Sequence, residues 1–137
     1  MDAVFFVCAP EAARQVRSID DVGEPAGDPL AVESPGALAG LISALDAEPR
    51  SALRQLRDAT CQSFPIWTFA GACTASIAAL DDDQVDAVAA RWLAADAAAL
   101  PDADPYQLAL CLGALRDALH GAASDARLFV LLEEKAW

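Results

Sequence analysis

The chain has 137 residues, of which 21 are acidic and 9 are basic, and its formal net charge is −12. Because 55% of the residues are hydrophobic, the composition indicates a folded domain with a negative surface and excludes a disordered acidic tail. The charge balance also disfavours nucleic acid as a direct ligand, since phosphate binding needs clustered lysine and arginine. The length fits a single domain over residues 1–137.

Signals for export or membrane insertion are missing from the sequence. Asp2 stands where a signal peptide needs positive charge, and the uncharged residues 64–80 are interrupted by Pro65 and Gly71. We therefore expect a cytoplasmic protein without a membrane span, in which residues 64–80 form a buried helix. The cysteines show no CxxC spacing, so we expect reduced, metal-free thiols that pack as small core residues. They are Cys8, Cys61, Cys73 and Cys111.

The first elements are predicted to be a strand, a short helix and an acidic loop. Residues 4–8 form a continuous apolar run, which is typical of a strand buried on both faces. Pro10 suits the first turn of a short helix over residues 11–17. Residues 20–29 contain two prolines and two glycines, which favours an exposed loop, and residues 30–32 fit a short edge strand.

Two helices are predicted to follow. Ser34 and Pro35 fit the N-cap and first position of a helix with an apolar face formed by Leu38, Leu41, Ile42 and Leu45. A second helix is expected over residues 49–61, with Leu53 and Leu56 facing inward. Its outer stripe would hold Arg50, Arg54 and Arg57. We interpret this stripe as a solvated face, with the alternative that it forms an internal partner for the acidic loops.

Residues 80–85 carry the clearest local signal in the chain. Asp81 fits an N-cap and Gln84 fits the third helical position, which together make a capping box. Leu80 and Val85 flank the box as a hydrophobic staple. We therefore predict that a helix begins here, with Val85, Val88, Ala89 and Trp92 facing the core.

A last helix and a last strand complete the prediction. Asp104 and Pro105 again form a cap and first-turn pair, and a broad apolar stripe follows at Leu108, Cys111, Leu112, Leu115 and Leu119. Gly121 suits the left-handed position after a helix end. Residues 128–132 form a second apolar strand. The predicted fold class is α+β, a mostly helical single domain packed on a small sheet that pairs the N-terminal and C-terminal strands.

Motifs for catalysis are not found in the sequence. His120, the single histidine, is expected at a helix C-terminus, where it can cap carbonyl groups. Neither a Ser-His-Asp arrangement, a phosphate-binding glycine loop nor an HExxH motif has local support. Cys61 has the most polar setting of the thiols, but only Arg57 lies near enough in sequence to lower its pKa. We predict a non-catalytic protein with no cofactor and no metal site.

The layout has an apolar strand at each end, a helical middle with an aromatic cluster over residues 64–69, and strong acidity. It resembles small bacterial immunity proteins, including those paired with contact-dependent growth-inhibition toxins. The resemblance implies a cognate toxin as partner, such as a nuclease, whose basic cleft the protein would block. Two other classes stay open: a cytosolic scaffold or regulatory domain that self-associates, and a small-molecule-binding protein.

Two acid-rich segments are the candidates for a surface that meets a basic protein partner. Residues 20–33 contain no basic residue, and Arg91 is the only basic residue among residues 81–104. Helix caps explain Asp81 and Asp104. Trp67 is the candidate aromatic anchor, with the alternative that the aromatic residues 64–69 form a core plug at the start of a helix. The candidate partner-binding residues are Asp21, Glu24, Asp28, Trp67, Asp83, Asp86 and Asp102. The alternative is that these acids only keep an alanine-rich protein soluble.

Overall fold

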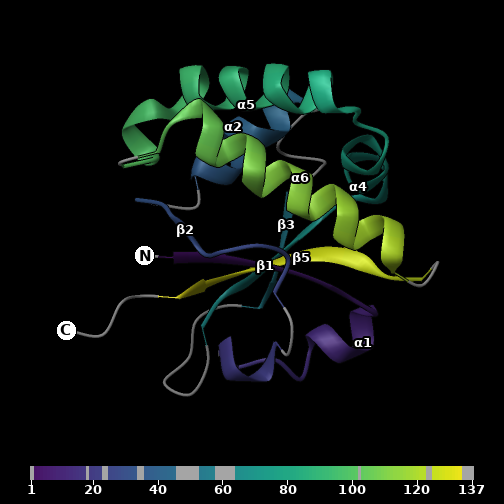
Figure 1. The fold of residues 1–137 in the computed structure, drawn as a ribbon. Coiled ribbons are helices and arrows are strands. Elements are labelled where there is room, and N and C mark those ends of the chain that lie inside the picture. Colours follow the sequence, from purple (N-terminus) through teal and green to yellow (C-terminus); the bar gives the residue numbers. More distant parts are fainter. Residues whose placement is uncertain are drawn as a thin grey trace.

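The computed structural model describes residues 2–17, 19–22, 25–33, 36–45, 53–57, 64–101, 103–122 and 125–133. Within these residues the strands are β1 (Asp2–Cys8), β2 (Leu30–Ala31), β3 (Leu53–Arg57), β4 (Ile66–Phe69) and β5 (Arg127–Glu133). The helices are α1 (Pro10–Ala13), α2 (Gly36–Ala44), α4 (Gly71–Ala78), α5 (Asp82–Asp96) and α6 (Pro105–Gly121), with 3-10 turns η1 (Ile19–Asp21) and η2 (Ala97–Ala99). Figure 1 shows α2, α4, α5 and α6 on one side of the sheet and α1 on the other.

The strands form one antiparallel sheet in the order β2-β1-β5-β4-β3. The N-terminal and C-terminal strands pair at its centre, with Val4 opposite Leu131 and Phe5 opposite Val130. This pairing confirms the predicted α+β fold. The central residues of both strands, 3–8 and 128–132, are apolar because both faces of the sheet are covered.

Alternation along β1 sends its side chains into two separate hydrophobic clusters. Phe5 joins the larger cluster, between the sheet and the helices. Val4 and Phe6 join a smaller cluster on the α1 side, where the Phe6 and Phe129 rings stack with centroids 5.5 Å apart. The sheet therefore separates a large helix-side core from a small α1-side core.

Helix α5 is the outermost helix, and its main contacts are with α2 and α6 rather than with the sheet (Figure 1). It is held there by Trp92, which is completely buried and whose Nε1 donates a hydrogen bond of 2.8 Å to the Ala37 carbonyl in α2. Arg91 donates from Nε and Nη2 to the Ala44 carbonyl at 3.1 and 2.8 Å. A guanidinium thus caps the C-terminal end of α2, where the helix dipole favours a cation.

The predicted helix starts at Asp81 and Asp104 are confirmed. The Asp81 carboxylate accepts from the Gln84 backbone N–H at 2.8 Å, and the Gln84 side chain accepts from the Asp81 N–H at 2.9 Å. Asp104 accepts from the Gln107 N–H at 2.7 Å. Each cap joins residues only three positions apart, so the local sequence contains all that it needs.

Removing the cap of α5 should destabilise the protein modestly. In Asp81→Ala, early N–H groups of the helix lose their acceptor, and we expect the free energy of unfolding to fall by about 1 kcal/mol. The measurement is urea denaturation followed by circular dichroism. Asp83→Ala is the matched control, since Asp83 is an exposed aspartate of the same turn that is not the cap. Equal losses in the two variants would show that the capping box contributes nothing specific.

The helix predicted over residues 49–61 is wrong, because the structure has strand β3 at Leu53–Arg57. β3 pairs with β4, with Leu53 opposite Phe69 and a bulge between Gln55 and Arg57. The segment consists of good helix formers, but pairing with the open edge of β4 outweighs that preference. Leu53 packs on the helix-side core and Leu56 on the α1-side core, so the two do not share an inward face. Because this helix does not form, the predicted stripe of Arg50, Arg54 and Arg57 along one helix face does not form either.

Three smaller predictions also need correction. Residues 64–80 are not one helix, because Ile66–Phe69 form β4 and α4 begins only at Gly71. The predicted helix over residues 11–17 ends as α1 at Ala13. Gly121 is the last residue of α6 rather than a left-handed cap, and among the described glycines Gly27 is the one with positive φ. The predicted cap at Ser34 and Pro35 lies outside the described residues.

Candidate partner-binding surface

The outer face of α6 carries two exposed apolar side chains. Tyr106 is 73% exposed and Leu110 is 58% exposed, and they are the large hydrophobic residues that are exposed in the described part of the chain. Their spacing of four residues places them on one face of the helix. The inward face is formed by other residues, Leu108, Cys111, Leu112 and Leu115, which are buried. Tyr106 and Leu110 are therefore not needed for the core.

A groove of about 470 Å³ lies between α5 and α6 along these side chains. Tyr106 and Leu110 line it on the α6 side, and Asp82 and Asp86 line it on the α5 side. Asp117 and Arg116 lie further along α6. An apolar strip is thus bordered by carboxylates from the acid-rich segment that includes α5.

A second hollow, of about 310 Å³, lies on the other side of Leu110 and contains Asp28. Gly27 makes this approach of the loop possible: its φ is +82°, and a Cβ there would stand 2.9 Å from the Ala114 Cβ of α6. The loop is anchored to the sheet by the Ala26 N–H, which donates to the Phe5 carbonyl at 2.8 Å. A side chain at position 27 would push the loop from the helix.

The two acid-rich segments of the sequence therefore lie on opposite sides of the same helix, α6. We call this region the α6 surface, and it consists of Asp28, Asp82, Asp86, Tyr106, Leu110 and Asp117. Asp28 and Asp86 form no ion pair with any residue that the structure describes. Their charges are available to a ligand outside the molecule.

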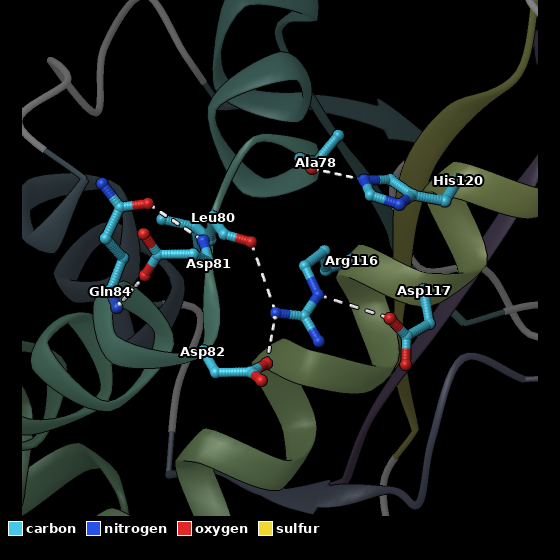
Figure 2. A network of polar contacts seen from close by, with 8 residues as sticks. All are labelled: Ala78, Leu80, Asp81, Asp82, Gln84, Arg116, Asp117 and His120. Atoms are coloured by element: carbon cyan, nitrogen blue, oxygen red, sulfur yellow. Dashed lines mark hydrogen bonds and ion pairs between the residues drawn. The ribbon is translucent and has the colours of Figure 1, made fainter.

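A polar network fixes the geometry beside the α6 surface (Figure 2). Arg116 donates from Nη1 to the Asp82 carboxylate at 2.9 Å and to the Leu80 carbonyl at 3.3 Å, and from Nε to Asp117 at 3.3 Å. The hydrogen bond to Asp82 is the largest of the interactions that raise the pKa of Arg116. One side chain of α6 thus holds the start of α5 in place.

His120 makes a second link in the same network (Figure 2). Its Nε2 is hydrogen-bonded to the Ala78 carbonyl, at the last residue of α4. The sequence predicted a histidine that caps carbonyl groups at a helix C-terminus, and the carbonyl that it reaches belongs to a neighbouring helix. The α4–α5 turn is therefore tied to α6 at two points.

The remaining candidate residues lie elsewhere. Asp21 is exposed in η1, where its carboxylate accepts from the Arg17 N–H at 2.9 Å. Asp83 is exposed on α5 but does not line the groove. Trp67 is half-buried in β4 against the helix-side core, and its buried Nε1 has no hydrogen-bond partner among the described residues. Glu24 and Asp102 lie outside the described residues.

The sequence analysis missed Tyr106 and Leu110 as candidates. The sequence contained a signal for their exposure, because neither residue falls on the apolar stripe that runs through Leu108, Cys111 and Leu115. An apolar residue outside the stripe of an amphipathic helix is exposed unless a second layer covers it. Which side of α6 stays uncovered depends on how the helices pack, and local periodicity does not contain that information.

Of the described thiols, Cys73 and Cys111 are buried and Cys8 is half-buried. Loss of hydration raises the pKa of Cys111 to about 12 and that of Cys73 to about 11, and burial raises the pKa of Cys8 as well. Cys61 lies outside the described residues. Within the described part of the chain, no group of three or more His, Cys, Asp or Glu side chains is placed to hold a metal ion.

Comparison of the chain with protein-family models, with curated proteins and with solved structures found no match. Among the described helices, none is both long enough and apolar enough to cross a membrane.

Proposed function

We propose that this protein is a non-catalytic protein-binding domain whose α6 surface binds a basic protein. One observation carries the proposal: Tyr106 and Leu110 are exposed side by side, with carboxylates from two distant segments on both flanks. Protein interfaces commonly combine a few large apolar anchors, tyrosine among them, with a polar rim. The α6 surface has both parts.

The charge of the rim argues for a basic partner. The α6 surface has four carboxylates, the one guanidinium lining the same groove is that of Arg116, and the whole chain has a net charge of −12. The negative electrostatic field of these charges speeds the association of this protein with a positively charged protein and opposes its association with a negatively charged one. Self-association through this surface would bring Asp28 and Asp86 of two copies together, so a second copy of the chain is the weaker candidate.

The resemblance to small immunity proteins suggests the nature of the partner. In that case the partner is a toxin such as a nuclease, whose substrate-binding cleft is basic because it must hold phosphates. The protein would act by covering the cleft, with Tyr106 and Leu110 as anchors and the carboxylates in place of substrate phosphates. This mode of action requires no catalytic group in the protein itself.

The test is affinity capture from the native lysate with matched baits. The baits are the wild type, a Tyr106→Ala/Leu110→Ala double variant, Asp86→Lys, and Asp20→Lys as the control. Asp20 is exposed in η1 and outside the α6 surface, so its reversal changes net charge equally. We expect a basic protein to be retained by the wild type and by Asp20→Lys and to be lost from the double variant.

Kinetics with the purified partner complete the test. Loss of the two anchors should weaken affinity at least tenfold, mainly through faster dissociation. Asp86→Lys should slow association at low salt, and this effect should shrink as ionic strength rises. Capture of only the chain itself, or equal retention of a partner by all four baits, would contradict the proposal.

A further inference from the structure

A second candidate site lies on the opposite side of the sheet from α6. It is a cavity of about 380 Å³ bounded by α1, by strands β3, β4 and β5, and by the first residues of α4. Three of its lining residues are arginines: Arg14 next to α1, Arg54 in β3 and Arg127 in β5. The chain has only 9 basic residues against 21 acidic ones, and no carboxylate is found among the described residues that line the cavity.

Sheet register explains why the strand arginines converge. Arg54 lies opposite Thr68, which lies opposite Phe129, so the three side chains share one face of the sheet. Arg127 precedes Phe129 by two residues and therefore lies on that face as well. Strand pairing thus brings together two arginines that are more than seventy positions apart in the chain.

The two strand arginines have few interactions of their own. Within the part of the chain that the structure describes, Arg54 forms no side-chain hydrogen bond or ion pair, and Arg127 donates only to the adjacent Ala126 carbonyl at 3.0 Å. Both residues are exposed. Their N–H groups are therefore available to an acceptor in the cavity.

The start of α4 adds backbone donors to the same cavity. Ala70 is the N-cap and supplies no side-chain cap, so the first N–H groups of the helix lack the acceptor that a polar cap would give. At Gly71 an added Cβ would meet nothing within 4 Å, so the backbone there is open to the cavity. The partial positive charge of a helix N-terminus favours an anion at this place.

We propose that this cavity binds the phosphate group of a small organic phosphate. Guanidinium groups from separate strands, with backbone N–H groups as a further donor set, suit a tetrahedral and doubly charged group. A flat carboxylate would need only one bidentate arginine. The apolar lining by Leu56 and Phe129 fits the organic part of the ligand. A polyanion is disfavoured by the net charge of −12.

This proposal does not depend on the proposed function, because the cavity and the α6 surface lie on different faces of the sheet. The test is isothermal titration of the full chain with phenyl phosphate, inorganic phosphate and benzoate at fixed pH and ionic strength. The variants are Arg54→Gln and Arg127→Gln, with Arg17→Gln as the control. Arg17 is exposed and does not line the cavity, and its replacement changes net charge equally.

We expect saturable binding of one phenyl phosphate, tighter than that of inorganic phosphate or benzoate. Loss of a charge-assisted pair should weaken binding about tenfold or more in Arg54→Gln and Arg127→Gln and leave Arg17→Gln unchanged. Amide resonances of Gly71 and Ala72 should shift on titration. Should Arg54→Gln fail to fold, Arg54→Lys keeps the charge but loses the bidentate geometry and should still bind more weakly.

Three outcomes would overturn the proposal. The first is the absence of saturable phosphate binding by the wild type. The second is an equal loss of affinity in Arg17→Gln, which would indicate a response to net charge alone. The third is benzoate binding as tight as phenyl phosphate, which would identify the site as a general carboxylate and anion site without selectivity for phosphate.

Discussion

Replacing Trp92 by alanine should lower the free energy of unfolding by about 3–5 kcal/mol, because the indole fills the space between α5 and α2. The side chain is completely buried, and its Nε1 donates to the Ala37 carbonyl at 2.8 Å. The Trp92→Ala substitution would leave a large cavity and would also remove that hydrogen bond. Urea denaturation followed by far-ultraviolet circular dichroism measures the change.

Trp92→Phe is the informative companion variant. It keeps an aromatic ring in the site but loses the N–H donor and part of the volume, so its cost should be smaller than that of alanine. If Trp92→Ala lowered the free energy of unfolding by less than about 1 kcal/mol, this description of how α5 packs on α2 would be wrong. A cost for phenylalanine equal to that for alanine would show that the hydrogen bond, rather than volume, stabilises the contact.

The second large loss of stability is expected from a substitution at Leu131, in the centre of β5. Leu131→Ala should cost about 2–5 kcal/mol, since the residue is fully buried in the α1-side core and lies opposite Val4 and Ile66. Thermal or urea unfolding gives the value. That core is small, so a single cavity removes a large part of its contacts.

Leu110→Ala is the matched control for Leu131→Ala. It makes the same chemical change at a leucine that is 58% exposed, and its effect on stability should stay within about 0.5 kcal/mol. The same variant is expected to lose partner binding, so it separates stability from function. A near-neutral Leu131→Ala would mean that the α1 side of the sheet is not covered in solution.

The two candidate sites have opposite charge. Carboxylates border the groove along α6, and three arginines line the cavity beside α1. Each arrangement depends on strand order and helix packing. A ligand in the cavity and a partner on α6 would not compete for the same residues.

Local signals in the sequence were sufficient for several elements. The helix starts at Asp81 and Asp104 were predictable because a cap and its N–H partner lie three residues apart. The central strands were predictable because residues 4–8 and 128–132 are apolar without interruption, as burial on both faces requires. With two such strands and helical segments between them, the α+β class followed from the sequence.

Tertiary structure alone decided the edge of the sheet and the site geometry. Residues 53–57 have helix-favouring side chains, yet they form a strand because β4 offers a ladder of backbone partners. Similarly, Gly27 lets its loop touch Ala114, which brings Asp28 to the helix that carries Leu110. These contacts join residues far apart in the chain, and their energy depends on the whole packed arrangement. Local pattern therefore determined where most helices and the central strands form, and long-range packing determined which side chains meet at the surface.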